Sequence, residues 1–126
     1  MLIKFIEPDF QFSDERGSLT QLVHEGWKQV NYITSAAGAV RGNHFHKENR
    51  EAFFVTEGAF KLEVEHAQTH EKETYQIKKG DFFIIYPHVL HSFTYTEPTV
   101  LISLYDNGVE HPDGTKDIFT EAEFNA

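Results

Sequence analysis

Residues 38–58 constrain the fold and the chemistry of this chain more than any other stretch. Two histidines, His44 and His46, stand two positions apart, and on an extended strand this spacing places both imidazoles on one face. The polar residues 47–50 can turn the chain, and Glu51 then opens an apolar segment typical of a following strand. A hairpin of this kind brings the Glu51 carboxylate back beside the two imidazoles. These three side chains are candidate ligands of a metal ion.

The remainder of the chain has the pattern of an all-β protein. About ten short segments rich in aromatic and β-branched residues are separated by turn signals. Residues 60–65 alternate between apolar and polar, whereas residues 82–86 are continuously apolar, as expected of a strand covered on both faces. The pattern predicts an antiparallel jelly-roll barrel, built as a single domain from residues 1–126. A threonine N-cap with a glutamate three positions later predicts a short C-terminal helix at Thr120–Phe124.

Composition excludes several classes of function. The formal net charge is −9, which argues against a nucleic-acid-binding surface. Cysteine is absent, so the chain forms no disulfide, which suits a reducing compartment. No apolar run approaches the ~20 residues that a membrane span requires, and residues 1–8 are too short and too soon charged for a signal peptide. We therefore expect a cytoplasmic protein whose partners are neither nucleic acids nor membranes.

Residues 38–58 resemble the first sequence motif of the cupin superfamily. The defining positions of that motif, with their spacings, are matched by Gly38, His44, His46, Glu51 and Gly58. The resemblance covers about half of the chain once the second motif is included. It implies a jelly-roll barrel with a ligand-binding interior.

Residues 80–91 are similar to the second cupin motif, with two departures. The family usually has proline where this chain has Tyr86 and glycine where it has His88. His91 stands at the position of the remaining histidine ligand. The resemblance implies that a divalent metal ion is held by three imidazoles and one carboxylate: His44, His46, Glu51 and His91. Such a ligand set accepts zinc, iron, manganese or nickel.

Two further elements are similar to cupins that modify nucleotide-linked deoxysugars. One is the Asp-x-Arg-Gly element that contains Arg16, and the other is the Arg-Gly segment that contains Arg41. The resemblance implies that both arginines contact the phosphates of a nucleotide sugar. The string from Arg41 to His46, together with Glu51, looks most like the cupin domain of capsular-polysaccharide enzymes, where the matching ligands hold zinc. Zinc is therefore the metal that we expect first.

The same resemblance leaves two roles open for His44 and His46. In 3,4-ketoisomerases the histidine pair acts as acid and base without a metal. In 4-keto-sugar 3,5-epimerases the residue matching His44 is the general base, and a tyrosine near the position of Tyr105 is the general acid. We therefore treat His44, His46 and Tyr105 as candidate catalytic residues as well.

The sequence thus predicts a metal-containing cupin that epimerises or isomerises a nucleotide-linked keto-deoxysugar in surface polysaccharide biosynthesis. Two alternatives use the same ligands. One is an iron-dependent dioxygenase, and the other is a non-enzymatic sugar-binding or small-molecule-binding protein with a structural metal. Small cupins often dimerise by exchanging their first strand, and by this analogy Leu2–Ile6 predicts a homodimer.

Overall fold

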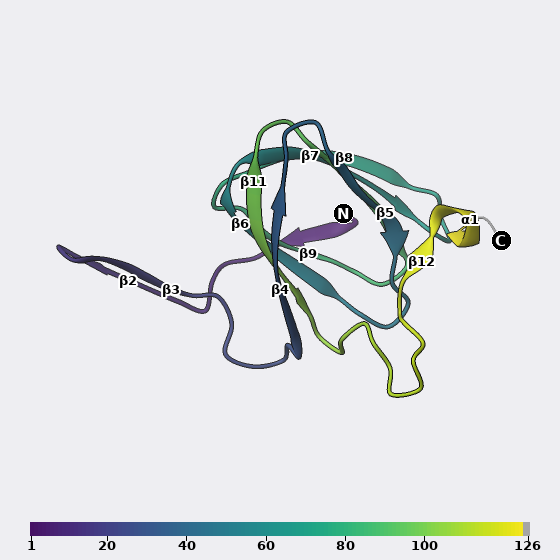
Figure 1. Cartoon of the computed structure of the whole chain (residues 1–126), viewed down its shortest axis with the longest axis horizontal. Helices are drawn as coiled ribbons and strands as arrows, with labels where there is room; N and C mark the ends of the chain where they lie inside the picture. Colours follow the sequence, from purple (N-terminus) through teal and green to yellow (C-terminus); the bar gives the residue numbers. More distant parts are fainter. Residues whose placement is uncertain (125–126) are drawn as a thin grey trace.

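The computed structural model describes residues 1–124 and contains two five-stranded antiparallel sheets that face each other as a barrel (Figure 1). Sheet one has the strand order β1-β9-β6-β11-β4. It consists of β1 (Ile3–Phe5), β9 (Phe82–Ile85), β6 (Glu51–Glu57), β11 (Thr99–Tyr105) and β4 (Gln29–Ser35). Sheet two has the order β12-β5-β10-β7-β8. It consists of β12 (Phe119–Thr120), β5 (Val40–Phe45), β10 (Val89–Tyr95), β7 (Ala59–His66) and β8 (Lys72–Lys78). The predicted all-β jelly-roll architecture of the cupins is confirmed.

Alternating side chains explain how the two sheets close on each other. In β7, Phe60, Leu62 and Val64 are buried, whereas the polar residues between them lie outside. They join residues from the inner face of sheet one, such as Phe53 and Leu101, in the main apolar core. The two sheets therefore meet over a core rich in stacked and edge-to-face aromatic rings.

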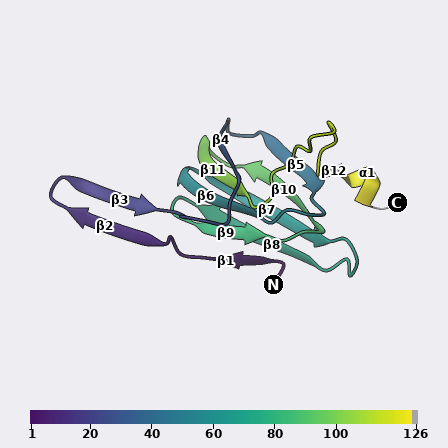
Figure 2. The ribbon, with the colours of Figure 1, turned by 90° about the horizontal axis from the view of Figure 1, so that it is seen from below.

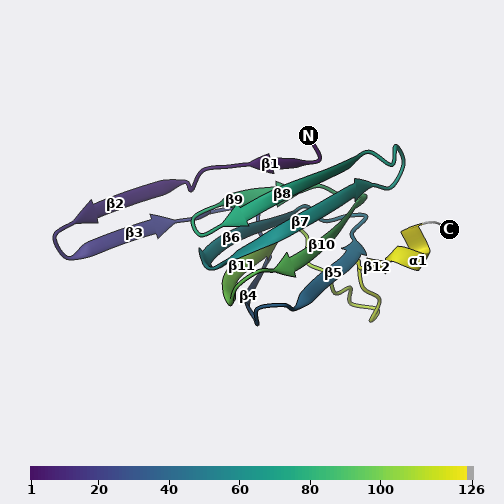
Figure 3. The ribbon, with the colours of Figure 1, turned by 90° about the horizontal axis from the view of Figure 1, so that it is seen from above.

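A two-stranded hairpin projects from the barrel. β2 (Phe10–Asp14) pairs with β3 (Gly17–Gln21), and neither strand belongs to a barrel sheet. The hairpin extends far beyond the body in all three views (Figures 1, 2 and 3). We refer to residues 10–21 as the arm.

The predicted first strand and the predicted C-terminal helix are both observed. The strand expected at Leu2–Ile6 is observed as β1, and it pairs with β9 of the same chain. The exchange of this strand between two chains stays a prediction. The expected C-terminal helix is observed as α1 (Glu121–Phe124). The backbone N–H and the hydroxyl of Thr120 both donate to the Glu123 carboxylate, at 3.2 and 3.1 Å. This contact places Thr120 at the start of the helix, as the spacing predicted.

Within residues 1–124, no helix has the length and the apolar character needed to cross a membrane.

Candidate metal centre and adjoining cavity

The four predicted metal ligands converge inside the barrel from both sheets. His44 lies on β5 and His91 on β10, where the two residues face each other across the strand pair. His46 follows the end of β5, and Glu51 opens β6 after a short turn. One potential ligand atom from each residue lies within 4.8 Å of the others. The turn inferred from the sequence brings Glu51 beside the histidines as expected, but the expected hairpin is wrong, because β5 and β6 belong to different sheets and do not pair. We call these four residues the ligand cluster.

The contacts of His46 indicate which of its ring nitrogens carry a hydrogen. Its Nδ1 lies 2.7 Å from the backbone carbonyl of Asp117, so Nδ1 must carry a hydrogen. Its Nε2 lies 3.1 Å from Oε1 of Glu51, which is also buried. A carboxylate and an unprotonated Nε2 would both be acceptors, so a proton has to lie between them in the metal-free protein. A divalent cation can replace that proton.

The pKa values of this pair follow from burial and mutual contact. Burial alone would lower the pKa of His46, but the hydrogen bond and the charge of Glu51 outweigh it and raise that pKa. Burial raises the pKa of Glu51, against the opposing contacts with His46, Tyr105 and Ser103. Both shifts indicate a pair that retains its shared proton when no cation is bound.

The contacts of His91 fit a metal ligand best. Its Nδ1 donates to the carbonyl of Val89 at 3.0 Å, so Nε2 carries a lone pair. This Nε2 is buried and has no hydrogen-bond partner among residues 1–124. It lies 3.7 Å from Oε1 of Glu51. Burial, and then the neighbouring His44 and His46, hold the pKa of His91 well below its ordinary value, so its lone pair remains available. Unsatisfied buried polar atoms are costly, and a cation accounts for this one.

The donor set as a whole fits a first-row divalent metal ion. Tetrahedral ligands about 2.1 Å from a metal are separated from one another by roughly 3.4 Å. The distances of 3.1 and 3.7 Å from Glu51 Oε1 to the two imidazole nitrogens lie on either side of that value. Three imidazoles and one carboxylate would complete a four-coordinate shell. The identity of the metal stays a prediction, with zinc first.

His44 differs from the other three ligands because it is partly exposed, and together with Glu51 and His91 it lines a cavity of about 420 Å³. Burial, and then the charge of His46, lower the pKa of His44 to about 4. The imidazole is therefore neutral at pH 7, which suits either a metal ligand or a general base.

Tyr105 lies on the wall of the same cavity, at the end of β11. Its ring contacts the His46 ring edge-on, and its hydroxyl is hydrogen-bonded to Glu51. Burial, and then the nearby Glu51, raise the pKa of Tyr105, so the phenol keeps its proton at neutral pH. The role of Tyr105 as a general acid stays a prediction.

The two predicted phosphate-binding arginines lie in different places. Arg41 lines the cavity, and its guanidinium donates to the Ser35 hydroxyl at 2.8 Å and to the Thr34 carbonyl at 3.1 Å. These bonds hold the guanidinium in place and leave further N–H groups for a ligand. Arg16 lies at the tip of the arm, where it is largely exposed and paired with Asp14 at 2.6 Å. Arg16 is not among the residues that line the cavity.

Asp117 supports the site through contacts that the sequence did not indicate. Its buried carboxylate accepts hydrogen bonds from the backbone N–H groups of residues 47, 48 and 49, at 2.8, 3.0 and 3.0 Å. It also accepts one from the side chain of Asn49 at 2.8 Å. Burial alone would raise the pKa of Asp117, but these bonds outweigh it and lower the pKa. Asp117 thus locks the turn between His46 and Glu51 and orients the His46 ring. We call Asp117 and residues 47–49 the clasp.

The family comparison agrees with the site. Residues 12–113 match the model of the polysaccharide biosynthesis C-terminal domain. The chain belongs to this family. The match ends four residues before Asp117, so the carboxylate of the clasp lies beyond the matched region. No curated protein matches the sequence.

Solved structures of sugar-modifying proteins share the fold of this family member. The QdtA 3,4-ketoisomerase of Thermoanaerobacterium thermosaccharolyticum, a double mutant in complex with TDP, is 26% identical with a TM-score of 0.68; the match covers 83% of this chain and 80% of that one. NovW, a 4-keto-6-deoxy sugar epimerase of Streptomyces spheroides, is 19% identical with a TM-score of 0.69, over 90% and 67% of the two chains. The capsular polysaccharide assembling protein CapF of Staphylococcus aureus is 23% identical with a TM-score of 0.65, over 88% of this chain but 32% of CapF. This family member therefore corresponds to about a third of CapF. The expected likeness to sugar-nucleotide-modifying cupins is confirmed.

Proposed function

We propose that the protein is a metal-containing isomerase or epimerase that acts on a nucleotide-linked keto-deoxysugar in surface polysaccharide biosynthesis. The observation that carries the proposal is the ligand cluster, because its residues His44, Glu51 and His91 line a cavity whose wall also contains Arg41 and Tyr105. Support comes from the family match and from the likeness to QdtA, a 3,4-ketoisomerase that was solved with TDP.

The reaction begins with loss of a proton from the carbon next to the sugar carbonyl. The electron pair of the C–H bond moves toward the carbonyl oxygen, and a proton returns to carbon in the product. In this reaction His44 serves as the base and not as a ligand, so a metal held by His46, Glu51 and His91 would keep an open position and would supply Lewis-acid polarisation of that carbonyl. His46 has both ring nitrogens engaged, so we assign it to the ligand shell. His44, which is neutral and faces the cavity, is the candidate base, and Tyr105 is the candidate acid.

Arg41 is the candidate phosphate contact within the same chain. Its anchored guanidinium faces the cavity, and charge-assisted hydrogen bonds to phosphate are among the stronger contacts that a protein makes. The phosphate contact proposed for Arg16 requires the arm to approach a bound ligand, and it stays a prediction.

Proton exchange in heavy water tests the activity directly. The purified protein is incubated with a panel of TDP-linked 4-keto-6-deoxy sugars, and loss of the carbon-bound proton signal is followed by NMR. We expect exchange with the wild type, and a loss on the order of 100-fold or more in His44→Asn. The matched control is His24→Asn, which changes an exposed histidine outside the cavity and should keep full exchange. Absence of exchange across the panel, with metal-loaded and metal-free protein, would falsify the proposal.

One observation favours a second candidate, a sugar-binding protein with a structural metal. Three of the four ligands are buried, and structural metal sites are closed by protein ligands alone. Elemental analysis separates the candidates when it is combined with the exchange assay. Stoichiometric zinc without exchange supports the binding protein, whereas iron with oxygen uptake supports the dioxygenase.

A further inference from the structure

A row of polar side chains leads away from the ligand cluster along the inner face of sheet one. Glu51 on β6 lies directly opposite Tyr105 on β11, and Ser103 lies two positions before Tyr105, so it shares the inner face. Ser103 is fully buried, and its hydroxyl is hydrogen-bonded to the Glu51 carboxylate. Asn31 on β4 lies directly opposite Ser103. The main core between the two sheets is otherwise apolar, so each polar side chain here needs a partner.

Four hydrogen bonds connect the Glu51 carboxylate to the loop that follows β11. The backbone N–H of Val109 donates to Oε1 of Gln29 at 2.9 Å. Nε2 of Gln29 donates to Oδ1 of Asn31 at 3.5 Å, and Nδ2 of Asn31 donates to Oγ of Ser103 at 3.5 Å. The fourth bond joins Ser103 to Glu51. We call Gln29, Asn31 and Ser103 the polar relay.

The backbone at Val109 fixes the direction of the polar relay. A backbone N–H can only donate, so the carbonyl oxygen of the Gln29 amide must face Val109. The N–H₂ group of Gln29 is then left to donate to Asn31, and that of Asn31 is left to donate to Ser103. The Ser103 hydroxyl has one hydrogen, and its neighbour Asn31 is already a donor. Ser103 therefore donates its hydrogen to the Glu51 carboxylate.

Glu51 needs such a hold because its carboxylate can rotate. Its Oε1 lies 3.1 Å from Nε2 of His46 and 3.7 Å from Nε2 of His91, which is the orientation of a shared ligand site. The last torsion of a glutamate side chain is broad, so the side chain alone does not select this orientation. Tyr105 also bonds to Glu51, but it is the candidate acid of the reaction. Ser103 is the partner that has no other role.

We propose that Ser103 is a positioning residue of the metal centre. Its hydroxyl, oriented by Asn31 and Gln29, holds the Glu51 carboxylate in the orientation in which it binds the ion. The inference rests on the ligand cluster of the proposed function, but it does not depend on the isomerase or epimerase reaction. Loss of a partner that orients a metal ligand lowers metal affinity by about 10–100-fold.

Zinc affinity, measured without substrate by competition with a chelator, tests this role. We expect Ser103→Ala to bind zinc about tenfold or more weakly than the wild type. Asn31→Ala keeps the Ser103 hydroxyl but removes its donor, so zinc affinity should fall by a smaller factor. The matched control is Thr99→Val, which removes another buried hydroxyl of β11. The Thr99 hydroxyl bonds to the carbonyls of Ala59 and Glu97, so zinc affinity should not change.

The absorption spectrum of bound Co²⁺ separates positioning from a general loss of stability. Its visible bands depend on the number and geometry of the ligands, and a less stable barrel with the same ligands would leave them unchanged. We expect Ser103→Ala to have an altered spectrum and Thr99→Val to have that of the wild type. Circular dichroism checks that each variant is folded.

Several outcomes overturn the proposal. These are a wild-type zinc affinity in Ser103→Ala or in Asn31→Ala, a wild-type Co²⁺ spectrum in Ser103→Ala, and a wild type that binds neither ion. Asn31→Ala leaves the buried serine in place, so it decides the question if Ser103→Ala does not fold. Since no substrate is used, tight metal binding without proton exchange would count against the proposed reaction and not against the role of Ser103.

Discussion

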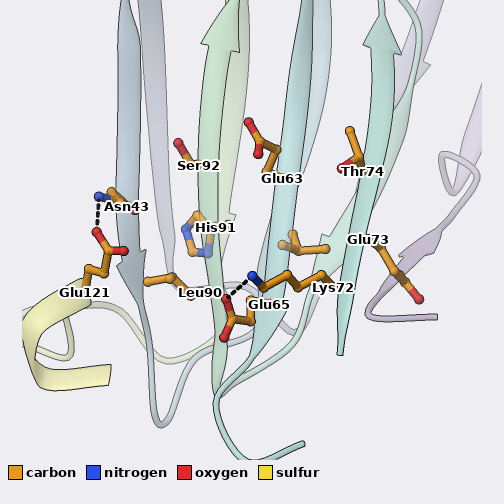
Figure 4. Close-up of a pocket in the computed structure, with 11 residues that line it drawn as sticks. Asn43, Glu63, Glu65, Lys72, Glu73, Thr74, Leu90, His91, Ser92 and Glu121 are labelled. Carbon is orange, nitrogen blue, oxygen red and sulfur yellow. Dashed lines mark hydrogen bonds and ion pairs between the residues drawn. The ribbon is translucent and has the colours of Figure 1, made fainter. Parts of the chain in front are cut away.

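The inner faces of the two sheets are both apolar, whereas their outer faces differ in polarity. Sheet one is apolar on both sides, whereas the outer side of sheet two carries a groove lined mainly by polar side chains (Figure 4). In this groove Lys72 pairs with Glu65 at 3.8 Å, and Asn43 donates to Glu121 at 2.8 Å. The exposed polar face of sheet two suits contact with water, and the apolar face of sheet one requires a protein cover. The contrast shows that one barrel can have an apolar outer face on one sheet and a polar groove on the outside of the other.

The largest expected effect comes from the outer face of sheet one. Leu104→Ala should lower the free energy of unfolding by about 2–5 kcal/mol, because Leu104 is as buried as a core residue although it points away from the barrel interior. Thermal or urea unfolding measures the loss. The control is Thr74→Ala on the outer face of sheet two, where we expect a change within about 0.5 kcal/mol. Similar losses for both variants would remove the contrast between the sheets.

The clasp joins the two sheets, since its turn connects β5 of sheet two to β6 of sheet one. In Asp117→Asn an amide N–H₂ group faces backbone N–H donors, so buried donors are left without an acceptor. The free energy of unfolding should therefore fall by about 3 kcal/mol. Metal affinity, measured by competition with a chelator, should fall about tenfold or more, as it does when outer-shell partners of ligands are lost. Asp113→Asn, in the same loop but exposed, is the control. Unchanged affinity in Asp117→Asn would mean that the clasp does not position His46.

The interior site should make the metal-free protein sensitive to acid. The folded pKa of His44 is about 4, below its ordinary value of 6.5, so the unfolded chain binds the proton first as the pH falls. The stabilisation from neutral His44 is complete above pH 6.5 and is lost as the pH falls toward 4. Between pH 7 and pH 5 the loss of stability from His44 amounts to about 2 kcal/mol.

Comparison of the wild type with His44→Asn in chelator isolates this contribution. The wild type should lose about 2 kcal/mol more stability than the variant between pH 7 and pH 5. Parallel stability curves for the two proteins would show that the His44 environment does not lower its pKa.

The smallest expected effect lies on the outer face of sheet two. Glu65→Gln removes an ion pair with Lys72 whose lysine is well exposed, so stability should change by about 0.5 kcal/mol or less at low salt. The difference should shrink further in 1 M salt, which is checked by urea unfolding at both salt concentrations. A salt-insensitive loss of several kcal/mol would indicate that this face is also covered by protein.

The sequence predicts the centre better than the surfaces. His44, His46 and Glu51 lie close together in the chain, so strand periodicity and one turn are enough to bring them together. The second motif keeps its turn despite its departures, because His88 adopts a φ of 66° where glycine is usual. This left-handed conformation costs roughly 1–2 kcal/mol, which the surrounding strands can offset.

Other features depend on contacts between distant residues, and no local pattern encodes them. Asp117 lies 71 residues after His46, in a loop without periodicity. The apolar outer face of sheet one arises from the pairing of four strands. On β4 alone, the alternation of Val30 and Tyr32 with Asn31 and Ile33 does not indicate which side faces the core. Arg16 was expected beside a ligand, but the projecting arm carries it away from the cavity of its own chain.

The position of Asp117 has a consequence for the order in which the protein becomes functional during synthesis. All four side chains of the ligand cluster leave the ribosome before Asp117 does. Until residue 117 docks, the turn between His46 and Glu51 lacks the carboxylate that binds its backbone N–H groups. We therefore expect a nascent chain to capture a metal ion weakly and to hold it firmly after residue 117 has been translated and has docked.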